Sequence, residues 1–369
     1  MAAVTLYGSP HSLYTGRARS YLIKASIPYR EALFNTPHYL EEVLPKAGNR
    51  QGMPTLEDGD GTVVRDGAAI IDHFEAQTGY QFSPSTPKQR VLSRLFDVIG
   101  AEGLLRPAMH YRWHFDDENL AFLTHHFGVI LPKGMEEYTE KMMNNMRRAT
   151  RNFGAIPDVL PLVESLYESL LQKMNNHFTQ VPYLLGGKPC IGDFGMIAPM
   201  YGHLGRDPKP LAMMQANAIQ VFRWVERMNR PELDLAEFVD TAPDYLVDDQ
   251  VPETLIELLR HLAIDFLPET RAAAATINEW LADNAVEPGT TAERAVGLAE
   301  FEVQGTSIKA IAQPYRFYLL TRVQNIYDEL AAEDQADVKK MLKSCNLAEL
   351  LDIRLTREIG RHNNLEVWV

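Results

Sequence analysis

A turn near the N-terminus carries the serine best placed to do chemistry. Residues 4–7 have the pattern of a short strand, residues 8–12 form a turn, and residues 13–25 have apolar side chains at helical spacing. Ser12 therefore stands at the entrance of a predicted helix, where unpaired N–H groups and the positive end of the helix dipole favour an anion or a thiolate. The alternative is that Ser12 is a plain N-cap, a common role for serine.

Two histidines have a spacing that could bind a metal. His110 and His114 are four residues apart, with acidic residues and two further histidines nearby. However, no His-Glu-x-x-His arrangement occurs, and histidines beside Trp113 and Phe115 are more often packed residues than ligands. We therefore expect no metal. Phosphate-loop, Gly-x-Gly-x-x-Gly and Gly-x-Ser-x-Gly motifs are missing too, so nucleotide-binding and hydrolase functions have no support.

Chain length, net charge and cysteine content limit the domain count, the partners and the compartment that can be expected. A chain of 369 residues exceeds what one core usually supports, so we expect two or three domains. The net charge of −13, with its acid concentrated in residues 231–369, argues against nucleic acid or an anionic membrane as a partner. No apolar run approaches the roughly 20 residues of a membrane span. With two cysteines and no secretory pattern in the first residues, we expect a cytoplasmic protein.

The elements that must position Ser12 follow within the first 80 residues. Residues 27–33 predict a second strand, and residues 39–43 a helical turn. Two short strands flank the tight turn at residues 58–61, and residues 68–75 have helical spacing. The predicted order is therefore β-α-β-α-β-β-α.

The rest of the chain is mainly helical in pattern. Residues 81–88 have the composition of a linker, and helical spacing follows at residues 90–105, 119–127, 137–152 and 159–177. Further on, residues 252–267 and 272–285 predict two helices, residues 301–303 and 306–311 a hairpin, and residues 315–330 and 334–351 two long helices. The chain ends in an apolar Val-Trp-Val.

Three local motifs resemble the thioredoxin-like domain of glutathione transferases. The turn at residues 9–12 before Arg-Ala-Arg resembles the segment of the family's catalytic serine or cysteine. Met53-Pro54-Thr55-Leu56 resembles the Val-Pro-x-Leu segment with a cis proline, and residues 66–70 resemble the segment that seats the γ-glutamyl group. A fourth motif, ending in Asp193, resembles the capping box of the family's helical domain. Cys190 stands there in place of Ser or Thr, so we expect one half of the cap to be missing.

The resemblance, which covers residues 1–230, implies a fold and a domain plan. We expect an α+β protein whose thioredoxin-like, glutathione-binding domain spans residues 1–80. A linker at residues 81–88 and an all-helical transferase-type domain at residues 89–230 would follow. Residues 231–369 would form a mainly helical acidic extension that contains the hairpin.

The resemblance also implies a binding site for glutathione as co-substrate. Ser12 would stabilise the thiolate, while the hydroxyl groups of Tyr7, Ser9 and Tyr14 are rival donors. The backbone of Met53, beside a cis Pro54, would pair with the cysteinyl part. The γ-glutamyl ammonium would meet Asp66, where Gly67 replaces a serine and one hydrogen bond is lost. The glycyl carboxylate would meet a member of the polar group Lys46, Asn49, Arg50 and Gln51.

The second substrate and the partners are less defined. Tyr111, Arg112 and Trp113 lie in an aromatic and basic segment that predicts either a pocket wall for a small electrophilic substrate or an interdomain core. The resemblance further implies a homodimer, unless the extension covers the pairing face. The alternative to an enzyme is a catalytically silent transferase fold that acts as a binding or protein-interaction module.

Overall fold

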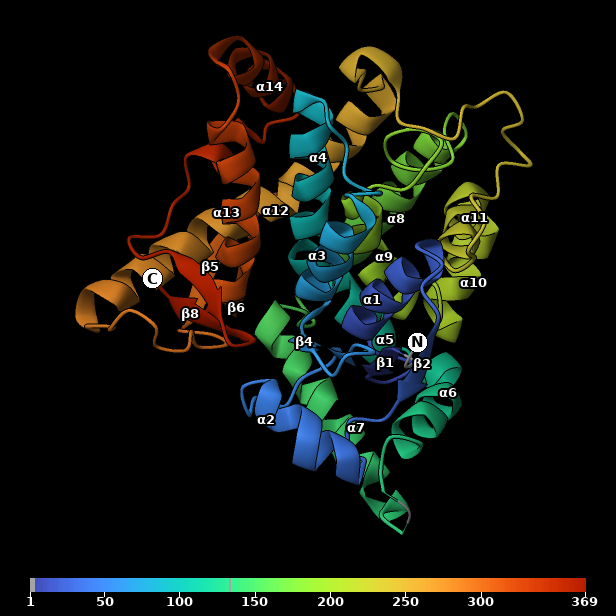
Figure 1. The fold of residues 1–369 in the computed structure, drawn as a ribbon, viewed down its shortest axis with the longest axis vertical. Helices are drawn as coiled ribbons and strands as arrows, with labels where there is room; N and C mark the ends of the chain where they lie inside the picture. The colour runs from blue at the N-terminus through green and yellow to red at the C-terminus, as the bar shows by residue number, and fades with distance from the viewer. Residues whose placement is uncertain (1–3, 133) are drawn as a thin grey trace.

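The N-terminal domain contains a mixed sheet of four strands in the order β2-β1-β3-β4. The computed structural model describes residues 4–132 and 134–369 of the chain (Figure 1). β1 runs parallel to β2 and antiparallel to β3, which pairs with β4 in a hairpin. The elements are β1 (Val4–Tyr7), α1 (Leu13–Lys24), β2 (Tyr29–Ala32), the π-helical η1 (Tyr39–Val43), α2 (Leu44–Lys46), β3 (Thr55–Glu57), β4 (Val63–Arg65) and α3 (Gly67–Thr78).

Helices alone make up the regular structure described between residues 87 and 228. The first begins with Pro87, whose missing N–H is tolerated at a helix start. The elements are α4 (Pro87–Val98), η2 (Ile99–Gly103), α5 (Leu105–Trp113), α6 (Asp116–Gly128), η3 (Glu136–Tyr138), α7 (Thr139–Arg148), η4 (Ala149–Phe153), α8 (Leu160–Phe178), α9 (Ile191–Gly202), α10 (Pro208–Asn217) and α11 (Ile219–Met228).

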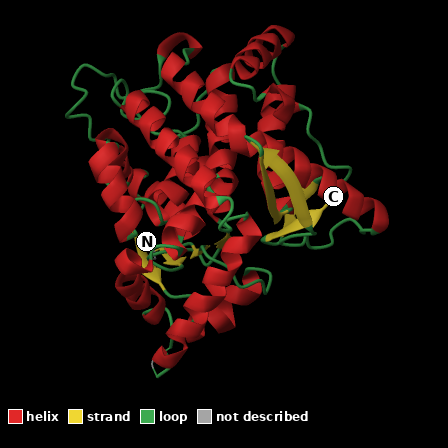
Figure 2. Ribbon diagram, turned by 180° about the vertical axis from the view of Figure 1, so that it is seen from behind, coloured by secondary structure: helices red, strands yellow, loops and turns green. Residues whose placement is uncertain are grey.

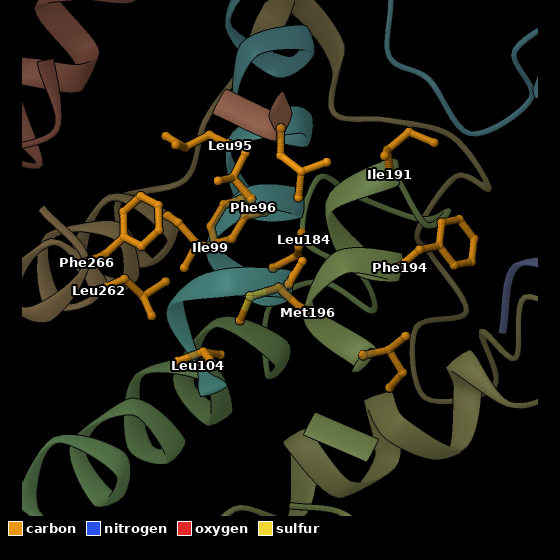
Figure 3. Close-up of a cluster of buried hydrophobic side chains, with 14 of the residues drawn as sticks. Leu95, Phe96, Ile99, Leu104, Leu184, Ile191, Phe194, Met196, Leu262 and Phe266 are labelled. Carbon is orange, nitrogen blue, oxygen red and sulfur yellow. The ribbon is translucent and has the colours of Figure 1, made fainter. Parts of the chain in front are cut away.

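The main core forms where α4 and α9 cross. Figure 3 shows Phe96 of α4 in one buried cluster with Met196 of α9, and Phe266 from the C-terminal part of the chain belongs to the same cluster. The two backbones approach so closely that a Cβ on Gly195 would lie 2.4 Å from Cα of Asp97. Glycine is needed here because any side chain would force the helices apart.

The start of α9 corrects the expectation that half of its cap is missing. Both halves of the capping box are present, with the thiol of Cys190 in the place of a hydroxyl. The backbone N–H of Cys190 donates to Asp193 at 2.9 Å. The buried thiol can take the place of a hydroxyl because sulfur accepts hydrogen bonds, although weakly. Asp193 carries the stronger half and also accepts bonds from Trp224 and Leu184.

The C-terminal part corrects a second expectation, that of two helices over residues 252–285. One helix, α12 (Glu253–Asp283), continues through Pro268. Proline removes one backbone hydrogen bond and usually kinks or ends a helix. Here buried residues on both sides of it, Phe266 and Ala273 among them, hold the two halves against the same core. Tertiary packing therefore overrides the local signal.

Two hairpins and two helices complete the extension. Figure 2 shows the hairpins near the C-terminus, and Figure 1 shows α13 alongside α4. An ion pair between Arg322 of α13 and Asp72 of α3 ties the extension to the N-terminal domain. The predicted hairpin corresponds to the first of the two; the second was not expected. The elements are η5 (Val247–Asp249), β5 (Leu298–Val303), β6 (Thr306–Ile311), α13 (Pro314–Asp328), α14 (Ala332–Ser344), η6 (Ala348–Leu351), β7 (Ile359–His362) and β8 (Leu365–Trp368).

The α+β class expected from the sequence is confirmed by the mixed sheet, the helical bundle and the C-terminal hairpins. Among the helices of the described residues, none has the length and apolar character needed to cross a membrane.

Candidate functional site

A pocket of about 230 Å³ lies where the N-terminal domain, the end of α4 and the extension meet. We call it the interdomain pocket. Segments from across the chain form its wall, so it exists only in the folded protein. Its lining residues are Tyr14, Arg50, Gly52, Met53, Pro54, Arg65, Asp66, Glu102, Ala292, Glu293, Arg294, Gln313, Tyr315 and Glu366.

Two of the sequence motifs meet in this pocket. The Met53–Pro54 peptide bond is cis, and the carbonyl of Pro54 accepts the backbone N–H of Asp66 at 2.9 Å. This bond sets the Met53 backbone beside the N-terminus of α3. An extended peptide lying along Met53 would therefore reach a helix N-terminus, which favours negatively charged groups.

Asp66 is the N-cap of α3 and has a second partner from the extension. Its Oδ1 accepts the backbone N–H groups of Ala68 and Ala69, at 2.9 and 3.2 Å. Its Oδ2 accepts the hydroxyl of Tyr315 at 2.8 Å. The carboxylate expected to meet an ammonium group is thus already hydrogen-bonded within the chain.

Gly67 lies in a confined place next to Asp66. A Cβ at this position would be 3.3 Å from Cδ of Arg17 and 3.3 Å from the carbonyl oxygen of Tyr14. A serine would have to displace one of these neighbours by a few tenths of an ångström. One of these neighbours, Arg17, is buried and pairs with Asp97, so a side chain at position 67 would have to fit against this ion pair.

The two basic and polar candidates before Met53 contact the extension as well. Arg50 donates to the carbonyl of Ala292 at 3.2 Å and lies 3.6 Å from Glu366. The carbonyl of Gln51 accepts a bond from Arg294 at 3.0 Å. The side chain of Gln51 is exposed and does not line the interdomain pocket.

Glu366, on β8, holds the extension against the N-terminal domain. It takes two hydrogen bonds from Arg65, at 2.8 and 2.6 Å, and one from Arg361 at 2.7 Å. The backbone of Asn364, at the turn of the same hairpin, accepts a further bond from Arg65. A buried carboxylate surrounded by guanidinium groups is well paired, since the planar fork of arginine matches the two oxygens.

Ser12 is the N-cap of α1, and its Oγ accepts the backbone N–H of Thr15 at 3.3 Å. It is half-buried and does not line the interdomain pocket. Tyr14, from the same helix start, does line it. The hydroxyl of Tyr14 donates to Oε1 of Glu102 at 3.3 Å.

The other two rival hydroxyl groups lie away from the pocket. Tyr7 is buried and donates to Glu57 at 3.2 Å, and burial together with the Glu57 charge raises its pKa to about 12. Ser9 is also buried, and its Oγ has no hydrogen-bond partner within the described part of the chain.

Glu102 is a polar residue of the pocket that sequence reasoning did not find. It is 2% exposed, and burial raises its pKa to about 7, against the opposing effect of Arg316. Tyr315 and Glu366 were missed in the same way. No local signal marks any of them, because each acts on residues far away in the sequence.

The segment considered for a second substrate lies in the interior. Arg112 is buried in a two-point ion pair with Asp207, at 2.6 and 2.8 Å. Trp113 packs against Phe127, and Tyr111 against Tyr167. None of the three lines the interdomain pocket.

The histidine pair is hydrogen-bonded internally. Nδ1 of His110 lies 2.9 Å from Nδ1 of His114, and its Nε2 lies 2.9 Å from Glu164. Within residues 4–132 and 134–369 no cluster of three or more His, Cys, Asp or Glu side chains has an arrangement that could hold a metal ion.

Comparison with known families matches residues 6–84 to the model of the glutathione S-transferase N-terminal domain. Curated protein sequences give no match to the chain. The similar solved structures include the beta-etherase LigF from Sphingobium sp. strain SYK-6, at 16% identity, with 64% of this chain and 99% of that chain covered and a TM-score of 0.45. The glutathione transferase GSTFuA3 from Phanerochaete chrysosporium has 15% identity, coverages of 63% and 98% and a TM-score of 0.45. For FzlA from C. crescentus the identity is 16%, the coverages are 70% and 99%, and the TM-score is 0.39.

Proposed function

We propose, from the match of residues 6–84 to the glutathione S-transferase N-terminal domain, that the chain binds glutathione in the interdomain pocket and stabilises its thiolate for attack on a small electrophile. One observation carries the proposal: the Met53–Pro54 segment and Asp66 are joined by a backbone hydrogen bond and line one pocket. An extended tripeptide would pair with the backbone of Met53 and direct its ammonium to Asp66.

The thiolate would be stabilised at the start of α1, where Tyr14 lines the interdomain pocket and Ser12 lies outside its lining. The Oγ of Ser12 accepts a backbone N–H, which leaves its hydroxyl hydrogen available for the ligand. A donated hydrogen bond and the helix dipole both favour the anion of a thiol. Tyr14 is the rival donor, because it lines the pocket. Its hydroxyl is engaged by Glu102, so we assign the role to Ser12.

Two basic residues would bind the glycyl carboxylate of glutathione. Arg294 and Arg50 both line the pocket. Both cysteines, Cys190 and Cys345, are buried and unpaired with each other, in keeping with a reducing cytoplasm. A homodimer is the arrangement we propose for the transferase, to be measured by light scattering.

A ligand-binding experiment tests the proposal. Glutathione at one hundred times its Kd should stabilise the folded chain by about 2.7 kcal/mol and raise its Tm by a few degrees. Asp66→Asn should lower the apparent affinity for glutathione at least tenfold and so reduce the Tm shift. Asparagine keeps the helix cap but removes the charge. Asp117→Asn, at the exposed start of α6, is the matched control and should leave the shift unchanged. If glutathione fails to raise the Tm of the wild-type chain, the proposal is wrong.

One observation favours the alternative of a silent binding module. Both charged anchors of the proposed seat already have partners from the extension: Tyr315 on Asp66, and Glu366 beside Arg50. In that case glutathione would compete with the chain's own contacts and bind poorly. The Tm measurement separates the two functions, because only the transferase requires a glutathione complex.

A further inference from the structure

Glu102 is a buried carboxylate in the interdomain pocket whose charge has no partner. It belongs to η2, at the end of α4, and lines the pocket. Its Oε1 accepts the Tyr14 hydroxyl, whereas its Oε2 has no hydrogen-bond partner among the described residues. Burying a carboxylate without pairing it is unfavourable. A residue kept in this state indicates that something else supplies the partner.

The two arginines whose charges act on Glu102, Arg316 and Arg17, form ion pairs with other acids. Arg17 of α1 pairs with Asp97. Arg316 of α13 pairs with Glu269 of α12 at 2.7 Å, and it donates to the backbone carbonyl of Glu102 rather than to its carboxylate. Within the part of the chain that the structure describes, neither arginine donates a hydrogen bond to the carboxylate of Glu102, because both pair with other acids.

The second acid at this end of the pocket is Asp66. Its Oδ2 accepts only the neutral hydroxyl of Tyr315, and it lies close enough to raise the pKa of Glu102 further. Two carboxylates, Glu102 and Asp66, and two tyrosines, Tyr14 and Tyr315, thus line the same pocket. A primary ammonium, with three N–H donors, is the group that complements this set.

We propose that Glu102 and Asp66 together bind the ammonium of the pocket's ligand, so that Glu102 sets the preference for a ligand with a free amine. The identity of that ligand, glutathione through its γ-glutamyl amine, rests on the proposed function. Glu102 would be a binding residue supplied by the helical part of the chain, outside the matched domain.

Binding through Glu102 has a defined pH dependence. Its pKa is raised to about 7 by burial, with Asp66 adding to the rise and with Arg316, Arg17 and the Tyr14 hydroxyl opposing it. The carboxylate form holds the ammonium. Affinity should therefore be full above pH 7 and fall as the pH drops below it, while the ligand's amine remains protonated.

Calorimetric titration of the full chain with two probes tests the inference. The first is S-methylglutathione, whose blocked thiol removes any effect of Ser12. The second is its deaminated analogue, with a glutaryl group in place of γ-glutamyl. At pH 8 the wild type should bind the first probe at least tenfold more tightly. Glu102→Gln should reduce that preference about tenfold, keep the affinity for the second probe within twofold, and remove the loss of affinity between pH 8 and pH 6.

Two further variants serve as controls: a matched variant outside the pocket and a second substitution at Glu102. Glu57→Gln alters a carboxylate outside the pocket that also accepts a tyrosine hydroxyl, and it should change neither affinity. If Glu102→Gln does not fold, Glu102→Asp should lower the preference by withdrawing the carboxylate. An unchanged preference in the Glu102 variants overturns the inference and leaves the proposed function intact. Failure of both probes to bind the wild type overturns both.

Discussion

The proposed role of Ser12 as a donor to the thiolate is compatible with its observed role as a helix cap. As the N-cap of α1 its oxygen accepts the N–H of Thr15, but a hydroxyl group has one hydrogen to donate as well. The cap fixes the side chain at the helix N-terminus. A serine that caps the helix is therefore also oriented to donate to an anion there.

Removing this hydroxyl should raise the pKa of bound glutathione. A free thiol has a pKa near 8.5, and an activating site must favour the thiolate by about 2 units, or roughly 3 kcal/mol. In Ser12→Ala we expect that pKa to rise by about 1 unit or more, turnover to fall at least tenfold, and stability to drop by about 1 kcal/mol through the lost cap. Ultraviolet absorbance of the thiolate against pH measures the effect.

Two variants control this prediction. Ser12→Thr keeps the hydroxyl and the cap and should retain the low thiol pKa. Tyr14→Phe should leave it unchanged. If Tyr14→Phe raises the pKa and Ser12→Ala does not, the assignment of Ser12 is wrong and Tyr14 takes its place.

Glu102 should reduce the stability of the unliganded protein at neutral and alkaline pH. Its pKa is raised to about 7 in the fold by burial, so folding favours the protonated form. That stability is fully present below the unfolded pKa, near 4.3, and is lost as the pH rises through about 7. Glu102→Gln should thus be more stable than the wild type by up to about 3 kcal/mol at pH 8 and equal to it near pH 4. If thermal unfolding gives the wild type and Glu102→Gln the same Tm at pH 8 as well as at pH 4, the predicted loss of stability from Glu102 is wrong.

At the scale of elements, the cap of α9 depends on Asp193 more than on Cys190. The buried carboxylate accepts the N–H groups of Cys190, Leu184 and Trp224, at 2.9, 3.2 and 2.9 Å. Because α9 also crosses α4 in the main core, the start of this helix fixes a large part of the packing.

Variants of the two cap residues should differ sharply in stability. Asp193→Ala leaves three buried donors without a partner, and we expect a loss of about 3–5 kcal/mol. Cys190→Ser replaces a weak acceptor by a better one and should remain within about 1 kcal/mol of the wild type. Chemical denaturation of both variants measures the difference, and a larger loss in Cys190→Ser would contradict our ranking.

The continuous α12 shows that tertiary packing can override the local signal for the end of a helix. Pro268 removes one hydrogen bond, but the helix is long and its apolar face is buried on both sides of the proline. The helix therefore continues, since the packing of many side chains outweighs a local loss of roughly 3 kcal/mol.

At the scale of the molecule, the C-terminal extension forms one wall of the interdomain pocket. It supplies Tyr315 to Asp66 and Glu366 to Arg65, and its residues 292–294 line the same pocket. The last hairpin thus connects the end of the chain to β4 of the N-terminal sheet.

Neutralising Glu366 should weaken the attachment of the last hairpin to the N-terminal domain. In Glu366→Gln, Arg65 and Arg361 lose a buried charged partner, and we expect a loss of about 2–4 kcal/mol. Hydrogen exchange of residues 359–368 should become faster, and the pocket should open. Glu358→Gln, an exposed residue just before the hairpin, is the control and should behave as the wild type. Unchanged exchange in Glu366→Gln would show that the hairpin is held by packing alone.

The sequence by itself determined the elements of the first 80 residues, because hydrophobic period and turn chemistry act over a few positions. It also predicted the α+β class and the first C-terminal hairpin. The second hairpin gave too short a pattern, with only an apolar end visible in residues 367–369.

Only the tertiary structure decided which side chains meet. Glu102, Tyr315 and Glu366 come from segments that are 36 to 301 residues away from the Asp66 and Arg65 they act beside. No local pattern encodes such distances, since they follow from how helices and hairpins bury their apolar faces together. The sequence therefore marked one side of the pocket, and packing supplied the carboxylates on the other.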